Sequence, residues 1–202
     1  MILVGLSGVL GSGKSTVGRA LATRGALVID TDEVARQALA PGSAGERAVI
    51  EHFGPAVTRP DGAVDRQALA DIVFADNAQR LALEAIIHPV VQQEVARRVE
   101  AARADVVVVE LPLLDRSRRQ QYHFDLVVLV DVPEEVAVER AVARGLSEAD
   151  VRARIAAQPT PSERRAAADW ALDNAGSPSD LEARVDDLWR RIEQRAGGRA
   201  AG

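Results

Sequence analysis

The stretch Gly8-Val9-Leu10-Gly11-Ser12-Gly13-Lys14-Ser15-Thr16 decides the fold of this 202-residue chain. Its spacing, G-x-x-x-x-G-K-S, is that of a phosphate-binding P-loop. The apolar run Ile2–Leu6 before it predicts a strand, and Val17, Ala20 and Leu21 after it fall on one helical stripe. Between a strand and a helix, the backbone N–H groups of such a loop surround a phosphate at the positive end of the helix dipole. We therefore predict a nucleotide-phosphate site; the alternative is a glycine-rich turn with an exposed lysine.

Lys14 is the only lysine among 25 lysine and arginine residues. In a P-loop this compact ammonium bridges the β- and γ-phosphates, and the following hydroxyl, Ser15, ligates Mg²⁺. GTPases of the common kind need a second lysine to recognise guanine, so we do not expect one here. The predicted nucleotide-binding residues of the loop are Gly11, Ser12, Gly13, Lys14, Ser15 and Thr16.

The composition narrows the classes of protein further. Hydrophobic residues make up 47% of the chain but aromatic residues only 3%, so the core must be aliphatic and no stacking platform for single-stranded nucleic acid is expected. A net charge of −5 argues against a surface that binds polyanions. The absence of cysteine excludes disulfides and fits a cytoplasmic protein. Met1 leads directly into the first strand, so we expect no signal peptide, and no apolar run is long enough to span a membrane.

Short apolar runs without alternation predict strands that are buried on both faces of a parallel sheet. Helical patterns lie between these runs, which predicts an α/β fold of the three-layer P-loop kind with about five parallel strands. The runs are Ile2–Leu6, Ala26–Ile29, Val106–Leu111, Leu126–Val132 and the weaker Trp170–Leu172.

About 75 residues between the second and third runs lack any strand pattern, so we predict an inserted helical subdomain over residues 33–103. Turn signals, including His88-Pro89, are expected to break its helices. Residues 134–165 are helical in pattern and rich in arginine, and we predict that they form a lid. Residues 1–32, 104–133 and 166–195 would form the core, closed by an amphipathic helix over 180–195, and residues 197–202 are expected to be a disordered tail.

Asp32 follows the second predicted strand at the carboxyl edge of the sheet, next to the P-loop. There its carboxylate would face the space beyond the γ-phosphate and align an attacking hydroxyl, with late transfer of the proton. Arg36, one helical turn later, lies on the same face and would hold a phosphate of the substrate. In the alternative interpretation, Asp30 or Asp32 simply caps the following helix. The sequence leaves both interpretations open.

Several separated blocks, reaching from the P-loop to about Arg195, resemble the dephospho-coenzyme A kinase family. The matching blocks are Gly8–Thr16, Ile29–Asp32 with Arg36, Pro41-Gly42, Phe53-Gly54, Asp61-Gly62, Asp65-Arg66 with Leu69, Val73-Phe74, Leu83-Glu84, Ile87–Pro89, Pro112–Leu114, Arg140, Arg144-Gly145, Arg154-Ile155 with Gln158, Ala168-Asp169, Asn174 and Gly176.

The resemblance implies ATP-dependent phosphorylation of the ribose 3′-hydroxyl of dephospho-coenzyme A by a P-loop kinase. It implies that Asp32 is the proposed base, that Arg140 and Arg144 are lid arginines reaching the phosphates, and that Asn174 lies near the adenine. The residues that it implies for the acceptor pocket are Arg36, Arg66, His88, Pro112 and Leu113.

Each implied role has a plainer alternative. His88 could be a packed, neutral imidazole at a helix stop, and Arg140 and Arg144, four residues apart on one helix face, could lie on a solvated face with Glu139 and Glu148. Glu110 ends an apolar run. Its carboxylate could orient a water bound to Mg²⁺, or the residue could simply stand at the end of a strand.

The chain also departs from the family at three places. Val9 and Leu10 stand where the family usually has Gly and Ile, and Asp115 follows Pro-Leu-Leu where Glu is usual. Two other functions therefore remain open. One is a P-loop kinase for another small acceptor, such as a nucleoside monophosphate, shikimate or gluconate, and the other is a catalytically silent nucleotide-binding module.

Overall fold

The structure is a computed structural model that describes residues 1–112 and 116–200. The chain divides into two compact units. Met1–Asp30 and Ala102–Gly202 form one, which contains every strand of the sheet and is called the sheet unit below. Thr31–Ala101 form the other, which is called the helical unit.

The sheet unit is built on five parallel strands in the order β2-β3-β1-β4-β5. The predicted α/β class and the five parallel strands are confirmed. Every residue of β3 is buried and β4 is nearly as well covered, which explains their unbroken apolar pattern. The strands are β1 (Ile2–Gly8), β2 (Leu27–Asp30), β3 (Val106–Leu111), β4 (Leu126–Asp131) and β5 (Trp170–Asp173).

The strand order changes one inference drawn from the sequence. We expected the second strand to lie next to the P-loop, but β2 pairs with β3, and β3 is the strand that pairs with the P-loop strand β1. Chain order does not determine sheet order, because a helical crossover can carry the chain past a neighbouring position. The carboxylate on the strand beside β1 is therefore Glu110 of β3, which pairs with Leu6 of β1.

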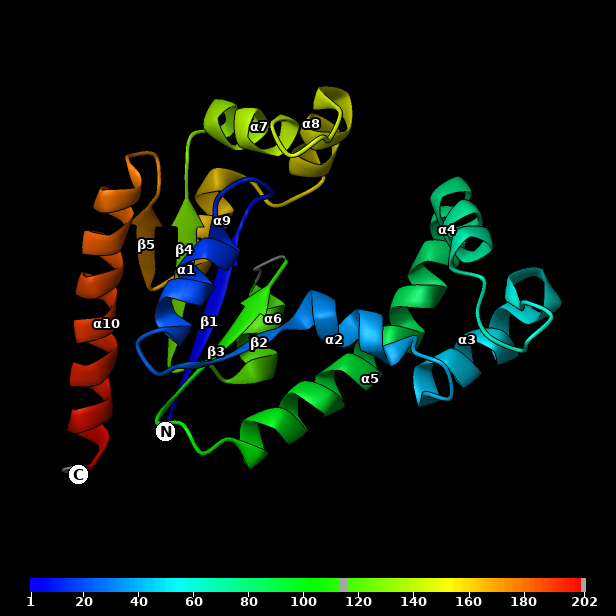
Figure 1. The fold of residues 1–202 in the computed structure, drawn as a ribbon, viewed down its shortest axis with the longest axis horizontal. Coiled ribbons are helices and arrows are strands. Elements are labelled where there is room, and N and C mark those ends of the chain that lie inside the picture. The colour runs from blue at the N-terminus through cyan, green and yellow to red at the C-terminus, as the bar shows by residue number, and fades with distance from the viewer. Residues whose placement is uncertain (113–115, 201–202) are drawn as a thin grey trace. The chain divides into compact units, whose positions relative to one another are not determined.

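Helices pack against this sheet, and one cluster of aliphatic side chains joins α1 and α10 to β1, β3 and β4 (Figure 1). The cluster includes Leu6, Val17, Val108 and Val128, all without exposed surface, so the core is aliphatic as predicted. The helices of the sheet unit are α1 (Lys14–Ala22), α6 (Arg116–Tyr122), α7 (Glu134–Val142), α8 (Glu148–Ala156), α9 (Pro161–Ala167) and α10 (Pro178–Ala200).

Helix α10 forms from the amphipathic stripe that the sequence predicts. Leu181, Val185, Leu188 and Ile192 are buried in the core cluster. The helix continues through Ala200, into the segment for which we expected disorder from residue 197. Alanine favours helix, and a partly buried Ala196 still packs against the core cluster, so the last apolar contact lies near the expected end.

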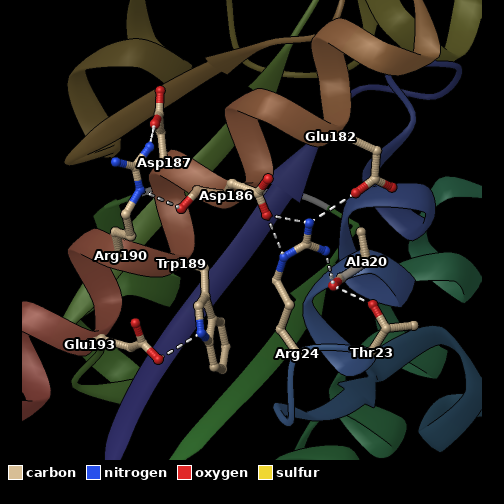
Figure 2. Close-up of polar contacts among 9 residues, drawn as sticks. All are labelled: Ala20, Thr23, Arg24, Glu182, Asp186, Asp187, Trp189, Arg190 and Glu193. Carbon is tan, nitrogen blue, oxygen red and sulfur yellow. Dashed lines mark hydrogen bonds and ion pairs between the residues drawn. The ribbon is translucent and has the colours of Figure 1, made fainter.

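Arg24 joins the end of α1 to α10, as Figure 2 shows. Its guanidinium donates to Asp186 Oδ1 at 2.6 Å, to Glu182 Oε2 at 2.9 Å and to the carbonyl oxygen of Ala20 at 2.7 Å. The two carboxylates raise the pKa of Arg24 further above its usual value. Because the Arg24 side chain is only 19% exposed, these bonds are better shielded from solvent than an ordinary surface pair.

Replacing Arg24 with alanine is expected to lower the free energy of unfolding by about 1 kcal/mol, because both carboxylates of α10 lose their partner just beyond the end of α1. The loss should shrink in about 0.5 M NaCl, where exposed charges are screened. Urea denaturation at two salt concentrations measures both effects. Arg190→Ala is the matched control, because Arg190 pairs with Asp187 within α10 alone (Figure 2). Equal losses for the two variants would contradict the role of Arg24 between helices.

The helical unit contains α2 (Thr31–Ala38), α3 (Ala44–Phe53), the 3₁₀ helix η1 (Gly54–Val57), α4 (Arg66–Ala75) and α5 (Asn77–Ala101). The predicted break at His88-Pro89 is wrong, because α5 runs through Pro89 for 25 residues. Proline removes one helical hydrogen bond, but the buried Ile87 and Val91 on either side hold the helix in place. In the described part of the chain, no helix is both long and apolar enough to cross a bilayer.

Candidate active site

The P-loop turns between β1 and α1 through two glycines with left-handed backbone angles. Gly11 has φ 85° and Gly13 has φ 88°. A Cβ atom on Gly11 would lie 2.0 Å from the carbonyl oxygen of Ala137, and one on Gly13 would lie 2.3 Å from Asn174 Nδ2. Both positions therefore require glycine for its backbone angle and for space.

Lys14 is the first residue of α1, directly after this turn. Its Nζ donates a hydrogen bond of 2.9 Å to the carbonyl oxygen of Leu111, the last residue of β3. The ammonium is thus held at the carboxyl end of the strand beside β1. This is the edge of a parallel α/β sheet at which ligands bind.

Ser15 and Glu110 form a pair beside the loop that we did not assign from the sequence. Ser15 Oγ donates to Glu110 Oε2 at 3.2 Å. Glu110 is 4% exposed, and burial raises the pKa of its carboxyl group, with the positive charge of Lys14 opposing the shift. A Cβ on Gly18 would lie 1.9 Å from Glu110 Oε1, so a glycine in α1 leaves room for the carboxylate. The signal in the sequence was a glutamate closing the run Val106–Val109.

These oxygens fit the magnesium ion that P-loop chemistry implies. A hydroxyl backed by a carboxylate offers hard oxygen atoms, and Mg²⁺ commonly completes its shell with waters and substrate phosphates. The described residues include no group of three or more His, Cys, Asp or Glu side chains that could bind a metal by itself.

Asn174 holds the P-loop from the β5 side. Its Nδ2 donates to the carbonyl oxygen of Ser12 at 2.7 Å, and its backbone N–H donates to the carbonyl oxygen of Asp131 at 2.9 Å. The side chain is buried, with 6% of the residue exposed. Asn174 thus contacts the backbone that carries the predicted phosphate site.

Val9 does not obstruct the loop. It is 6% exposed and belongs to an apolar cluster with Val132, Val138 and Ile155, which joins the start of the loop to α7 and α8. Its φ is not positive, since His123 is the one non-glycine residue with positive φ in the described part of the chain. The branched side chain is therefore accommodated by packing against the two helices.

Arg140 and Arg144 differ in their surroundings. Arg140 lies in α7 and is half-buried, and its buried Nη1 has no hydrogen-bond partner. Arg144 is exposed and follows α7, which ends at Val142, so the expected single helix face for both residues is wrong. Glu148, a candidate neighbour on a solvated face, instead accepts a bond of 2.9 Å from Arg152.

In the helical unit, Asp32 and Arg36 lie on α2 and are both exposed. Asp32 is the second residue of the helix and so lies inside its first turn, whereas Asp30 directly precedes the helix. Arg36 Nη2 lies 2.6 Å from Glu33 Oε2. Glu33 also accepts from Gln37, whose amide oxygen accepts from Arg98 of α5 at 2.6 Å. This chain of bonds holds α2 against α5.

Arg66 begins α4, after Asp65, whose side chain accepts from the N–H groups of Gln67 and Ala68. Arg66 Nη2 donates to the carbonyl oxygens of Arg36 and Leu39, each at 3.2 Å. The structure thus brings Arg66 to the backbone of Arg36. Arg66 also lines a cavity of about 280 Å³ within the helical unit, together with Glu46 and Arg59.

The remaining residues that the resemblance implies for the acceptor pocket belong to other elements of the chain. His88 is exposed on α5, so the packed imidazole that we considered as an alternative is wrong. Pro112 follows β3 and is half-buried. Leu113 and Asp115, which also figured in the sequence predictions, lie outside the described residues.

Comparison with known proteins gives consistent matches. A family model described as Dephospho-CoA kinase matches residues 2–180. A dephospho-CoA kinase of Frankia casuarinae is 45% identical over 201 residues, which cover 99% of this chain and 87% of the relative. A dephospho-CoA kinase of Thermobifida fusca is 43% identical over 202 residues, which cover 98% of this chain and 100% of the relative. The crystal structure of TT1252 from Thermus thermophilus matches with a TM-score of 0.80 and 37% identity, over 94% of this chain and 97% of that one.

Proposed function

The chain belongs to the dephospho-CoA kinase family, and we propose how its residues perform that family's reaction. The enzyme is an ATP-dependent phosphotransferase that forms coenzyme A and ADP by phosphorylating the ribose 3′-hydroxyl of dephospho-coenzyme A. The alternatives, a kinase for another small acceptor and a silent nucleotide-binding module, are not favoured by matches that span nearly the whole chain.

The observation that carries the proposal is the loop formed by Gly11–Thr16, with the ammonium of Lys14 fixed beside it. Its N–H groups are proposed to bind the β-phosphate, and Lys14 Nζ to bridge the β- and γ-phosphates as negative charge moves onto the bridging oxygen. Asn174 supports this geometry through its bond to the carbonyl oxygen of Ser12, and it is proposed to lie near the adenine.

Ser15 Oγ is the group proposed to ligate Mg²⁺, with Glu110 orienting the hydroxyl or a water bound to the ion. When bound, the ion neutralises charge on the β- and γ-phosphates. Gly18 is part of this arrangement because it admits the carboxylate beside α1.

Asp32 is proposed to align the 3′-hydroxyl of the acceptor and to accept its proton late in the transfer. The second position of α2 supports this role, because the carboxylate is exposed and is not at the capping position of the helix. Arg36, Arg66, His88, Pro112 and Leu113 are proposed to bind the acceptor. The exposed guanidinium of Arg36 would exchange Glu33 for a phosphate of the substrate.

We assign the segments accordingly. Residues 33–103 are proposed as the substrate subdomain, residues 134–165 as the lid, and residues 1–32, 104–133 and 166–195 as the core. The cytoplasm is the proposed location, because the reaction consumes ATP and the chain has no cysteine.

An acceptor screen with ATP and Mg²⁺ tests the proposed function. Each candidate acceptor is incubated with the full chain, and the position of the new phosphate is determined by NMR. Phosphate on the ribose 3′-oxygen of dephospho-coenzyme A is the expected product. Transfer to shikimate, gluconate or a nucleoside monophosphate alone would overturn the assignment, and so would tight ATP binding with no transfer to any acceptor.

Replacing Arg140 and Arg144 together with alanine is expected to lower kcat about a hundredfold, because the developing charge on the phosphoryl group loses two cations. ATP affinity should fall far less, since Lys14 and the loop remain. Steady-state kinetics together with calorimetric ATP titration separates the two effects. Arg152→Ala is the control, because Arg152 is engaged by Glu135 and Glu148 on α7 and α8. A double variant with normal kcat would remove both arginines from the mechanism.

A further inference from the structure

A cavity of about 350 Å³ lies at the edge of the sheet opposite the P-loop. It is lined by Leu126 and Trp170, the residues that begin β4 and β5, whereas the P-loop follows the carboxyl end of β1. This volume falls within the range of small-molecule binding sites. None of the residues that line the cavity has a role in the mechanism proposed above, so its chemistry has to be considered separately.

Arg191 of α10 is held at this cavity by an aromatic contact. Its guanidinium carbon lies 3.7 Å from the centroid of the Trp170 ring. Among the described residues, Arg191 has neither a hydrogen-bond acceptor nor an ion-pair partner. The cation–π contact orders the side chain without using its N–H groups. The donors are therefore free to bind a ligand, and less side-chain entropy is lost when they do.

Arg195 lies one helical turn after Arg191 and lines the same cavity. It too lacks a hydrogen-bond or ion-pair partner in the part of the chain that the structure describes. Like charges four residues apart on a helix repel each other. An anion placed between the two guanidinium groups would remove that repulsion and accept hydrogen bonds from both.

The carboxylates close to these arginines are occupied by other donors. Asp169 lines the cavity, but its Oδ1 accepts from Arg119 Nη2 at 2.7 Å and its Oδ2 accepts from the N–H of Val127 at 2.9 Å. Glu193, which lies between the two arginines in the sequence, accepts from Trp189 Nε1 at 2.8 Å (Figure 2). The positive charge at the cavity is therefore not neutralised by these neighbours.

The remaining lining is partly apolar. Leu126 and Leu188 belong to the buried aliphatic cluster of the sheet unit. Gln194 is exposed and adds an amide that can donate further hydrogen bonds. The cavity thus combines two cations and an amide with a hydrophobic wall.

We propose that this cavity binds a phosphate monoester that carries a small apolar group. Two cations match the nearly double negative charge of a phosphate monoester at neutral pH, whereas a carboxylate has a single charge. The apolar group would contact Leu126 and Leu188 and lose its contact with water. The site lies at the amino ends of the strands, away from the proposed active site, and the inference does not depend on the proposed function.

Titration with phenyl phosphate tests the site on the full chain. Heteronuclear NMR follows the indole N–H signals of Trp170 and Trp189, the two tryptophans of the chain, which Trp189→Phe assigns. The Trp170 signal should shift until it saturates, with a Kd of about 5 mM or tighter for a ligand of this size. Absence of a saturable shift in this range would overturn the proposal.

Two fragments of the probe test its two halves. Inorganic phosphate lacks the apolar group, and benzoate has a single negative charge, so each should bind at least about fivefold more weakly than phenyl phosphate. Equal affinity for inorganic phosphate would contradict the contact with the leucines. Equal affinity for benzoate would contradict the preference for a double negative charge.

Variants then assign the contact to the two arginines. Arg195→Gln leaves the stacked pair of Arg191 and Trp170 in place and should weaken phenyl phosphate binding about tenfold or more, because a hydrogen-bonded charge is lost. Arg191→Gln should have an effect of the same size. Affinity that is unchanged by both variants would overturn the proposal, since a probe bound at the P-loop would not respond to either.

Arg190→Gln is the matched control, because it makes the same change on the same helix at a guanidinium that is paired with Asp187 (Figure 2). Its affinity for phenyl phosphate should stay within about twofold of that of the unaltered chain. A loss as large as that of Arg195→Gln would overturn the proposal, because any change of surface charge would then suffice. If Arg191→Gln does not fold, judged by circular dichroism, Arg195→Gln and its control decide the question.

Discussion

Lys14→Ala is expected to lower kcat/KM for ATP about a thousandfold and to weaken ATP binding as well. The chain has one lysine, and its Nζ is fixed at the carboxyl end of β3 by a 2.9 Å bond to Leu111. Removing it takes away the charge that is proposed to face the β- and γ-phosphates both before and during transfer, so affinity and rate should fall together. Steady-state kinetics and calorimetric titration with ATP measure the two losses.

Lys14→Arg is the informative comparison for this position. It keeps the positive charge but replaces a compact ammonium by a planar guanidinium that does not fit the same turn. We expect its activity to resemble that of Lys14→Ala, while its thermal stability stays close to that of the unaltered chain. If arginine restored most of the activity, charge alone would suffice, and the argument from the single lysine would be wrong.

The sheet was predictable because strands that are buried on both faces consist of short apolar runs without alternation. Val106–Leu111 is apolar up to its last residues, and the strand formed has the predicted bounds. The weak run at Trp170 also became a strand, since it adds to the edge of β4. Local sequence contains this information because the faces of a parallel strand are covered by helices wherever the strand sits in the sheet.

Contacts between distant segments were not predictable in the same way. Glu110 meets Ser15 and Gly18 only because β3 inserts between β2 and β1, and nothing in the run around Glu110 indicates that order. Asn174 contacts the P-loop across 162 residues of sequence. The P-loop itself was recognised because its chemistry lies within nine consecutive residues.

Pro89 and Val9 show why local rules failed at two positions. Proline usually ends a helix, but buried neighbours on α5 outweigh the loss of one hydrogen bond. Val9 stands where the family usually has glycine, and its side chain packs into an apolar cluster with α7 and α8. In both cases tertiary packing decided the local conformation, and the chain nearby carried no sign of it.

Asp32→Asn is expected to lower kcat about a thousandfold while ATP affinity changes little. The asparagine keeps the size of the side chain but loses the charge that is proposed to align the acceptor hydroxyl and to take its proton. The variant keeps the glycines of the phosphate-binding loop, Lys14 and Ser15, so the proposed contacts to ATP remain. Single-turnover kinetics with saturating dephospho-coenzyme A measures the chemical step, and calorimetry measures ATP binding.

Asp71→Asn is the matched control for Asp32, because it makes the same change at an exposed carboxylate in the same helical unit, on α4. It should leave kcat unchanged, since its carboxylate accepts a bond from Gln67 on its own helix. Near-normal turnover of Asp32→Asn would show that the Asp32 carboxylate has no role in the transfer. A loss confined to KM for the acceptor would instead assign Asp32 to binding. Only a fall in the single-turnover rate at saturating acceptor identifies a group that acts on the hydroxyl during transfer, because ground-state binding has by then been satisfied.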